Sequence, residues 1–169
     1  AAAELGGLEI PGNMAGIGDY GEVGSWGLDE IDKVLAVNGR AVIVASQAAS
    51  KHLTDGGRII TTGSCLAERV MEPGIALYAM SKAALIGFTK ALARDLGPRG
   101  ITVNVVHPGS TDTDMNPADG DHAEAQRLRM AIPRFGKAED IAGLIAYLAS
   151  EEGRFITGAG IAIDGGVNT

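Results

Sequence analysis

The sequence has little of three things: cysteine, aromatic residues and positive charge. A single cysteine, Cys65, excludes an internal disulfide and indicates a reducing compartment such as the cytoplasm. Aromatic residues make up only 4% of the chain, too few for the stacking platforms of RNA-binding or carbohydrate-binding surfaces. Fourteen basic residues against 21 acidic ones leave a net charge of -7, which makes nucleic acid a poor partner. No apolar run approaches about 18 residues, so we expect no membrane-spanning segment.

What remains is a chain suited to one packed domain. Its 169 residues, 46% of them hydrophobic, are enough for a core of their own. Glycine occurs 25 times, about twice its usual share of roughly 7%. Abundant glycine with few aromatic residues suits helices packed closely on a sheet. The first residue is Ala1 and not methionine, so we expect that the natural protein begins elsewhere.

Hydrophobic periodicity predicts alternating helices and strands. The expected strands are continuously apolar, which is typical of a parallel sheet covered on both faces, so the predicted class is α/β. Helices are expected at 29–52, 78–96 and 137–150, with a short one near 121–131; strands at 58–63, 101–106 and 160–163, with a weak one at 8–10 before Pro11 and a turn at 13–16. Ligands of such sheets bind beyond the carboxyl ends of the strands, where Ser64 and Pro108-Gly109 fall.

Tyr78 and Lys82 form a pair at the start of a predicted helix. The i, i+4 spacing places both on one helix face. An ammonium beside a phenol favours the phenolate, so we expect Lys82 to lower the pKa of Tyr78 and make it an acid or base near neutral pH. The alternative is a packing tyrosine and a solvated lysine, because this spacing is common by chance.

Two further polar residues have positions that suggest function. Ser64 ends a predicted strand 14 residues before Tyr78, and Asn38 lies inside a predicted helix although asparagine is a mediocre helix former. A serine that caps the strand and an asparagine that faces water are the alternatives for each one taken singly.

The order of motifs resembles the short-chain dehydrogenase/reductase family. The run Tyr78-Ala79-Met80-Ser81-Lys82 resembles the family's active-site helix, and Gly57–Ser64 and Gly100–Gly109 resemble the strands before and after it. Val37-Asn38 resembles the helix that carries an asparagine, and Asn13-Met14-Ala15-Gly16 resembles an Asn-Asn-Ala-Gly turn with Met14 in place of an asparagine. Phe155–Gly158 and Ile163–Gly166 resemble the family's C-terminal end.

This resemblance implies a Rossmann-like, doubly wound parallel sheet and an NAD- or NADP-dependent exchange between a carbonyl and an alcohol. Tyr78 would transfer the proton, Ser64 would hydrogen-bond the reacting oxygen, and Asn38 would hold a water that connects Lys82 to solvent. Lys82 would also bind the ribose of the cofactor. The catalytic residues implied are Asn38, Ser64, Tyr78 and Lys82; those implied to contact the cofactor are Asn13, Ala15, Gly16, Tyr78, Lys82, Pro108, Gly109, Thr111 and Thr113.

The family's Gly-rich dinucleotide turn is not found. Gly16-x-Gly18-x-x-Gly21 matches the spacing of the fingerprint. The fingerprint also needs a strand before it and a helix after it, and Pro11 before it and the glycine-rich stretch after it are unfavourable for both. The chain therefore resembles the family from its fourth strand onward, as a single partial domain over residues 1–169. Two functions stay open: an oxidoreductase, most like 3-oxoacyl-carrier-protein reductases, or a non-catalytic fragment serving as an oligomerisation or binding module. In the family the two long helices pack between subunits, which implies a homodimer or homotetramer.

Other polar residues do not form a recognisable site. Cys65 has no histidine placed beside it by any motif and is expected to be a buried thiol. The three histidines lack metal-ligand spacing, so no metal is expected. An acidic cluster lies where the family has its substrate loop and is expected to be a solvated lid: Asp112, Asp114, Asp119 and Asp121.

Overall fold

The sheet is parallel and has four strands in the order β1-β2-β3-β4. The structure, a computed structural model, describes residue 4 and residues 7–169. The strands are β1 (Gly12–Asn13), β2 (Arg58–Thr62), β3 (Thr102–Pro108) and β4 (Gly160–Ile163). The expected strands at 58–63, 101–106 and 160–163 are therefore confirmed to within two residues at each end.

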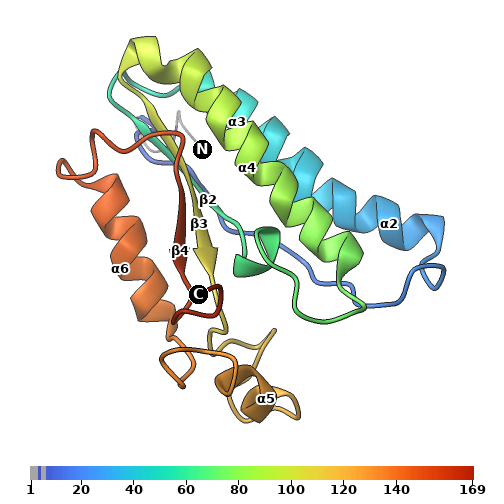
Figure 1. Ribbon diagram of the computed structural model, residues 1–169. Coiled ribbons are helices and arrows are strands. Elements are labelled where there is room, and N and C mark those ends of the chain that lie inside the picture. The colour runs from blue at the N-terminus through green and yellow to red at the C-terminus, as the bar shows by residue number, and fades with distance from the viewer. Residues whose placement is uncertain (1–3, 5–6) are drawn as a thin grey trace.

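Helices cover both faces of this sheet (Figure 1). Their bounds are α2 (Leu28–Leu35), η1 (Ala36–Arg40), α3 (Ala41–Ser50), η2 (Cys65–Ala67), α4 (Ala76–Leu96), η3 (Gly97–Arg99), α5 (Ala123–Arg127) and α6 (Ala138–Ala149). The run from α2 to α3 lies beside α4 on one face, and α6 covers the other. The loop that carries α5 lies beyond the carboxyl ends of the strands.

The two central strands are apolar because both of their faces are buried. All of β2 except its last residue, and all of β3 except Pro108, are buried. Alternate side chains point to opposite faces: Val103 packs with residues of α3 and α4, whereas Val106 packs with Leu148 of α6. This alternation confirms the α/β class, with a core on each side of one sheet.

The expected helix at 29–52 is continuous but not uniform. Between α2 and α3 the chain makes a π-helical turn, η1, and Asn38 lies in it. At the start of α2 the Glu30 carboxylate accepts a hydrogen bond from the Gly27 N–H at 2.5 Å. Single π turns inside α-helices are rare and occur often at functional sites, which gives the interior Asn38 a structural setting that periodicity alone did not reveal.

The first strand is shorter and lies later than expected. Leu8 makes one parallel bridge with Leu53, and the regular pairing of β1 with β2 covers only Gly12 and Asn13. The Pro11 carbonyl still accepts a hydrogen bond from the Ile60 N–H at 3.2 Å. A proline is tolerated here because β1 is an edge strand of the described sheet, so its missing N–H leaves no ladder bond unmade.

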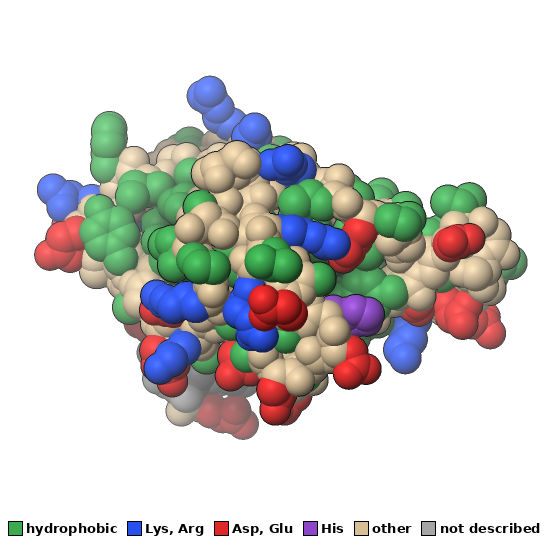
Figure 2. All heavy atoms as spheres, turned by 60° about the horizontal axis from the view of Figure 1, so that its bottom comes forward, with side chains coloured by type: hydrophobic (Ala, Val, Ile, Leu, Met, Phe, Trp, Pro, Cys, Tyr) green, Lys and Arg blue, Asp and Glu red, His purple; other side chains and the backbone are tan. Residues whose placement is uncertain are grey.

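The surface mixes charge of both signs with apolar side chains. On the face seen in Figure 2, Lys and Arg lie among Asp and Glu, with hydrophobic side chains between them. Within the described part of the chain, no helix is both long enough and apolar enough to cross a membrane.

Candidate active site

Tyr78 lies in the first turn of α4, which begins at the carboxyl-end side of the sheet. Burial raises the pKa of its phenol, and a hydrogen bond with the Ser64 side chain opposes this rise in part. The Lys82 Nζ is 5.8 Å from the centroid of the ring. The expectation of a lowered pKa for Tyr78 is thus not met in this structure, because loss of solvation is the largest influence on the phenol and raises its pKa. The phenol is protonated at neutral pH.

Ser64 follows β2 directly and begins the short turn η2. Its backbone is extended, and its Oγ accepts a hydrogen bond from the Leu66 N–H at 3.2 Å. The Ser64 N–H donates to Nδ1 of His107 at 3.2 Å. The residue is buried, and its hydroxyl interacts with Tyr78. The structure therefore brings together the serine and tyrosine that the sequence motifs singled out.

Lys82 is buried one turn further along α4, only 4% exposed. Its ammonium donates to the Thr62 carbonyl at 3.1 Å, and burial lowers its pKa. Gly16 gives this group room, because a Cβ at that position would lie 2.9 Å from Lys82 Nζ. The expected turn at 13–16 and the expected active-site helix thus meet at one point.

Asn38 ties three parts of the site together. Its Nδ2 donates to the Ile17 carbonyl at 2.9 Å and to the Ser81 Oγ at 3.0 Å, while its Oδ1 accepts from the Ile17 N–H at 2.9 Å. Both amide hydrogens are therefore already donated to protein. A role in holding water beside Lys82 stays a prediction, and the observed role is to fix the loop after β1 against α4.

The remaining residues expected to contact the cofactor differ in how closely they are joined to the elements that carry Ser64, Tyr78 and Lys82. Asn13 donates to the hydroxyls of Ser46 and Thr61, at 3.2 and 3.1 Å, and so joins β1 to α3 and β2. Ala15 is exposed in the loop between Asn13 and Gly16. Thr113 is exposed, and it hydrogen-bonds within its own loop, to Thr111 and Asn116.

The loop after β3 is held close to the end of β4. The Gly109 N–H donates to the Ile163 carbonyl at 3.1 Å, and a Cβ on Gly109 would lie 2.6 Å from the Asp164 Cα. Thr111 donates to the Gly109 carbonyl at 3.1 Å. Only glycine fits where the backbone at position 109 passes so close to Asp164, which explains the Gly109 of the Pro108-Gly109 pair by packing.

Sequence reasoning assigned no role to two residues that the structure places in the site. Ser81 is buried between Tyr78 and Lys82 on α4 and donates to the Tyr78 carbonyl at 2.7 Å. Tyr20 comes from the loop after β1, and its ring centroid is 6.1 Å from that of Tyr78. Ser81 stood inside the recognised motif, three residues after Tyr78, whereas nothing in the sequence pattern pointed to Tyr20.

Cys65 is buried as expected and packs with Met130 and Val167. Burial is the largest cause that raises its pKa to about 11, and the charge of Asp164 adds to it. A thiol of this kind is a poor nucleophile. Among the residues that the structure describes, no group of three or more His, Cys, Asp or Glu side chains is placed to hold a metal ion.

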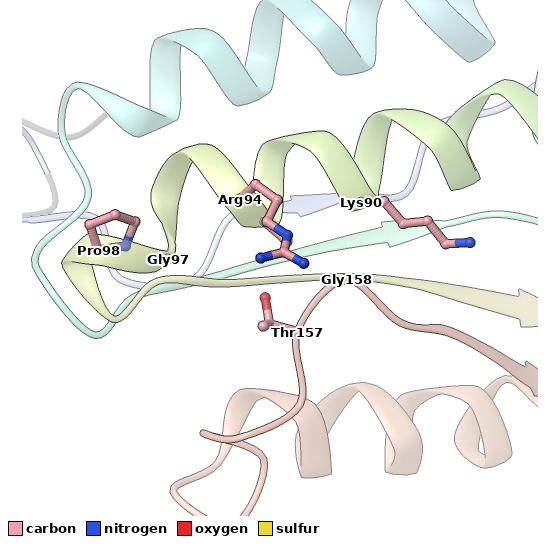
Figure 3. A pocket seen from close by; sticks show the side chains of 7 residues that line it. Lys90, Arg94, Gly97, Pro98, Thr157 and Gly158 are labelled. Carbon is pink, nitrogen blue, oxygen red and sulfur yellow. The ribbon is translucent and has the colours of Figure 1, made fainter.

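Hollows between described residues open on the surface at opposite ends of the strands, and two of them lie near the elements of the site. The larger, of about 730 Å³, lies between the C-terminal half of α4 and the loop before β4, and Lys90, Arg94 and Thr157 line it (Figure 3). The smaller, of about 240 Å³, lies beyond the carboxyl ends of β3 and β4, and Ser110, Met130 and Gly165 are among its lining residues. Of these two, the smaller hollow is the one at the carboxyl ends of the strands, where Ser64 and Tyr78 also lie.

Comparison with known proteins agrees with this geometry. The profile of a family described as enoyl-(acyl carrier protein) reductase matches residues 1–168. A short chain dehydrogenase/reductase of Aspergillus aculeatus is 36% identical over 179 residues, covering 98% of this chain and 68% of its own length. The chain belongs to the short-chain dehydrogenase/reductase family. The cyclic-di-GMP-binding biofilm dispersal mediator protein of Escherichia coli K12 is 46% identical over 160 residues, covering 95% of this chain and 68% of that protein.

Solved structures of this family superpose closely on the chain. A short chain dehydrogenase from Burkholderia cenocepacia in complex with NADP is 64% identical, with a TM-score of 0.98 over 99% of this chain and 69% of its own. A blue fluorescent protein from a metagenomic library, in complex with NADPH, is 50% identical, with a TM-score of 0.97 over 99% of this chain and 68% of its own. The Rossmann-like fold expected from the motifs is confirmed, and the chain corresponds to about two thirds of each of these proteins.

Proposed function

We propose that this chain carries the catalytic half of an NAD- or NADP-dependent oxidoreductase that interconverts a carbonyl and a secondary alcohol on a small molecule. The observation that carries the proposal is the group of buried Ser64, half-buried Tyr78 and buried Lys82, assembled from the end of β2 and the start of α4. Membership of the family, and the NADP and NADPH complexes of similar proteins, support it.

The residues present fit the nicotinamide-ribose half of such a cofactor. An ammonium group has three N–H donors, and the Thr62 carbonyl is the one acceptor for Lys82 that hydrogen bonds within the described residues supply. The donors that remain suit a pair of ribose hydroxyls. Gly16 supplies the space beside Nζ that a larger residue would fill. The residues implied to complete the contact are Asn13, Ala15, Pro108, Gly109, Thr111 and Thr113.

The bound cofactor supplies the hydride, and the protein supplies the proton and the positioning. Because its pKa is raised, Tyr78 holds its proton at neutral pH and can give it to a carbonyl oxygen. Ser64, whose Oγ already accepts from Leu66, has its own hydroxyl proton to donate to the same oxygen. Charge that develops on that oxygen is then stabilised by two hydrogen bonds in a site of low solvent access.

The substrate would enter beside the loop that carries α5, where the 240 Å³ hollow opens. Exposed Met115 in that loop and buried Met130 in the wall supply adaptable apolar surface. We propose a carbonyl compound of acyl type as the substrate class, and a reducing compartment such as the cytoplasm as the setting.

Titration with NAD(H) and NADP(H), followed by a carbonyl-reduction assay, tests the proposal. We expect binding of at least one nucleotide, and we expect Tyr78→Phe to abolish turnover while binding persists. Tyr147→Phe, in α6, is the matched control and should leave turnover unchanged. Full activity of Tyr78→Phe would refute the assignment of the proton donor.

We further propose that α3 and α4 form an interface between copies of the chain. The residues of α3 are apolar almost throughout, yet only Val42, Ser46 and Ala49 are buried. Ile43 and Val44 remain 48% and 53% exposed. A helix that is apolar on more than its core face is usually buried against a second surface as well as against its own core. This supports a homodimer or homotetramer. Val44→Glu should shift the sedimentation coefficient to that of a smaller species.

The same surface supports a second candidate function, a non-catalytic oligomerisation or binding module. The name of the Escherichia coli relative, a cyclic-di-GMP-binding protein, gives this alternative a specific ligand to test. Binding of cyclic-di-GMP with no binding of either nicotinamide nucleotide would favour the module over the enzyme.

A further inference from the structure

His107 is a buried histidine that the catalytic scheme above does not use. It lies near the end of β3, has no exposed surface, and continues the row of Val103 and Val105 toward α4. Two glycines on the flanking strands make room for its ring. A Cβ at Gly63 would lie 2.4 Å from Nδ1, and a Cβ at Gly160 would lie 2.9 Å from Nε2. The ring therefore has one tightly bounded place in the sheet.

The hydrogen bonds of the ring fix its protonation state. Nδ1 accepts from the Ser64 N–H at 3.2 Å, so a neutral ring carries its proton on Nε2. Nε2 is buried and has no hydrogen-bond partner among the described residues. Protonation of Nδ1 would remove the acceptor for Ser64 and leave a charged ring with unpaired donors on both sides.

We propose that His107 is a positioning residue for Ser64: its Nδ1 holds the backbone of that serine in place, and protonation of the ring releases it. The proposal rests on the proposed function, because it assumes that Ser64 hydrogen-bonds the reacting oxygen. Within η2 the Ser64 Oγ accepts from the Leu66 N–H and its carbonyl accepts from the Ala67 N–H at 3.0 Å, whereas His107 is the partner of its N–H. The His107 contact therefore fixes the N-terminal side of Ser64, and its loss shifts the direction of Oγ, where small misplacements reduce rate strongly.

Burial, the Ser64 backbone and charged groups on two sides of the ring together set the pH at which this release occurs. The carboxylate of Glu68, after η2, favours the protonated ring, and the ammonium of Lys82, in α4, opposes it. The nearest residues on the two strand sides, Gly63 directly after β2 and Gly160 in β4, bring no charge. Burial is the largest influence, and the pKa of His107 is lowered from its usual value of 6.5. Release is therefore expected only at a pH below the ordinary histidine pKa of about 6.5.

Two variants separate the acceptor from the bulk of the ring. In His107→Asn, Oδ1 takes the place of Nδ1 and can still accept from Ser64; in His107→Leu a methyl group stands there. We expect kcat for carbonyl reduction to fall about tenfold in His107→Leu and to stay within about threefold in His107→Asn, with the cofactor KM unchanged in both. Wild type should lose kcat as pH falls below about 6.5, and both variants should lack this acid limb. Equal loss in both variants, or none, would overturn the proposal.

A double mutant tests whether His107 acts through Ser64. In a Ser64→Ala background, His107→Leu should cost less than about twofold in kcat, because the group it positions is already gone. An undiminished tenfold loss would mean that His107 acts elsewhere. Full activity of Ser64→Ala itself would instead refute the proposed function.

A spectroscopic measurement tests for the hydrogen bond from the Ser64 N–H to His107 Nδ1, and it does not require the chain to turn over substrate. Imidazole nitrogen NMR of the folded wild-type chain should show a protonated Nε2 and an unprotonated, hydrogen-bonded Nδ1 at neutral pH. A proton on Nδ1 would overturn the proposal. The expected tautomer without any kinetic effect of His107→Leu would reduce the contact to packing, which also overturns the positioning role.

Discussion

Replacing Asn38 by alanine should destabilise the chain by about 2–3 kcal/mol. The side chain is 1% exposed and makes three hydrogen bonds, two to Ile17 and one to Ser81. Each contributes about 1 kcal/mol net. The Ile17 groups lie in a half-buried loop and can regain water, and the Ser81 hydroxyl keeps its bond to Tyr78, so little is added for unpaired partners. Native domains are stable by about 5–15 kcal/mol, so the loss is measurable without preventing folding.

Urea unfolding monitored in two ways measures this change. Far-UV circular dichroism follows the whole fold, and Trp26, the single tryptophan, lies near the loop that Asn38 holds. We expect a lower midpoint with an unchanged slope, and a local change at Trp26 that begins at lower urea. Gln47→Ala, at an exposed position of α3, is the control and should alter stability by less than about 0.5 kcal/mol. A loss below about 1 kcal/mol in Asn38→Ala would refute the reasoning from its three bonds.

Other contacts lead to four further predictions. Gly16→Ala should weaken nucleotide binding, because the new Cβ lies 2.9 Å from the end of Lys82; Gly143→Ala, with open space in α6, should instead stabilise the chain by about 0.5–1 kcal/mol in thermal unfolding. The Cys65 thiol, with a pKa of about 11, should resist alkylation at pH 8 until the chain unfolds; rapid labelling of the native chain would contradict its burial. Leu148→Ala should cost about 2–5 kcal/mol in urea unfolding, since the side chain is completely buried against the sheet.

The strands and helices were predictable because their apolar patterns reflect burial on two faces. The continuous run from Ile101 to Val106 is apolar because α4 packs on one side of β3 and α6 on the other. The exception, β1, shows the limit of local pattern. Its pairing depends on which backbone groups meet the neighbouring strand, and the Pro11 carbonyl serves that purpose although its sequence context is unfavourable for a strand.

The candidate site was predictable in membership and less so in chemistry. Motif order predicted that Ser64, Tyr78 and Lys82 lie together, and they do, because the end of β2 meets the start of α4; their catalytic roles stay a prediction. The pKa of Tyr78 was not predictable, since the spacing to Lys82 says which helix face the two share and nothing of how far water is excluded. Burial acts on the cation as well, lowering the pKa of Lys82.

The position of His107 in the site was not predictable from the sequence for a similar physical reason. Judged by spacing it is only a histidine without metal-ligand partners. What gives it a role is the space left by two glycines on neighbouring strands, a property of the sheet register and not of any local run. A polar side chain in an otherwise apolar central strand must be paired or costs free energy. A polar residue in an otherwise apolar central strand of the sequence therefore predicts a buried hydrogen-bond partner, even where no metal-ligand spacing is present.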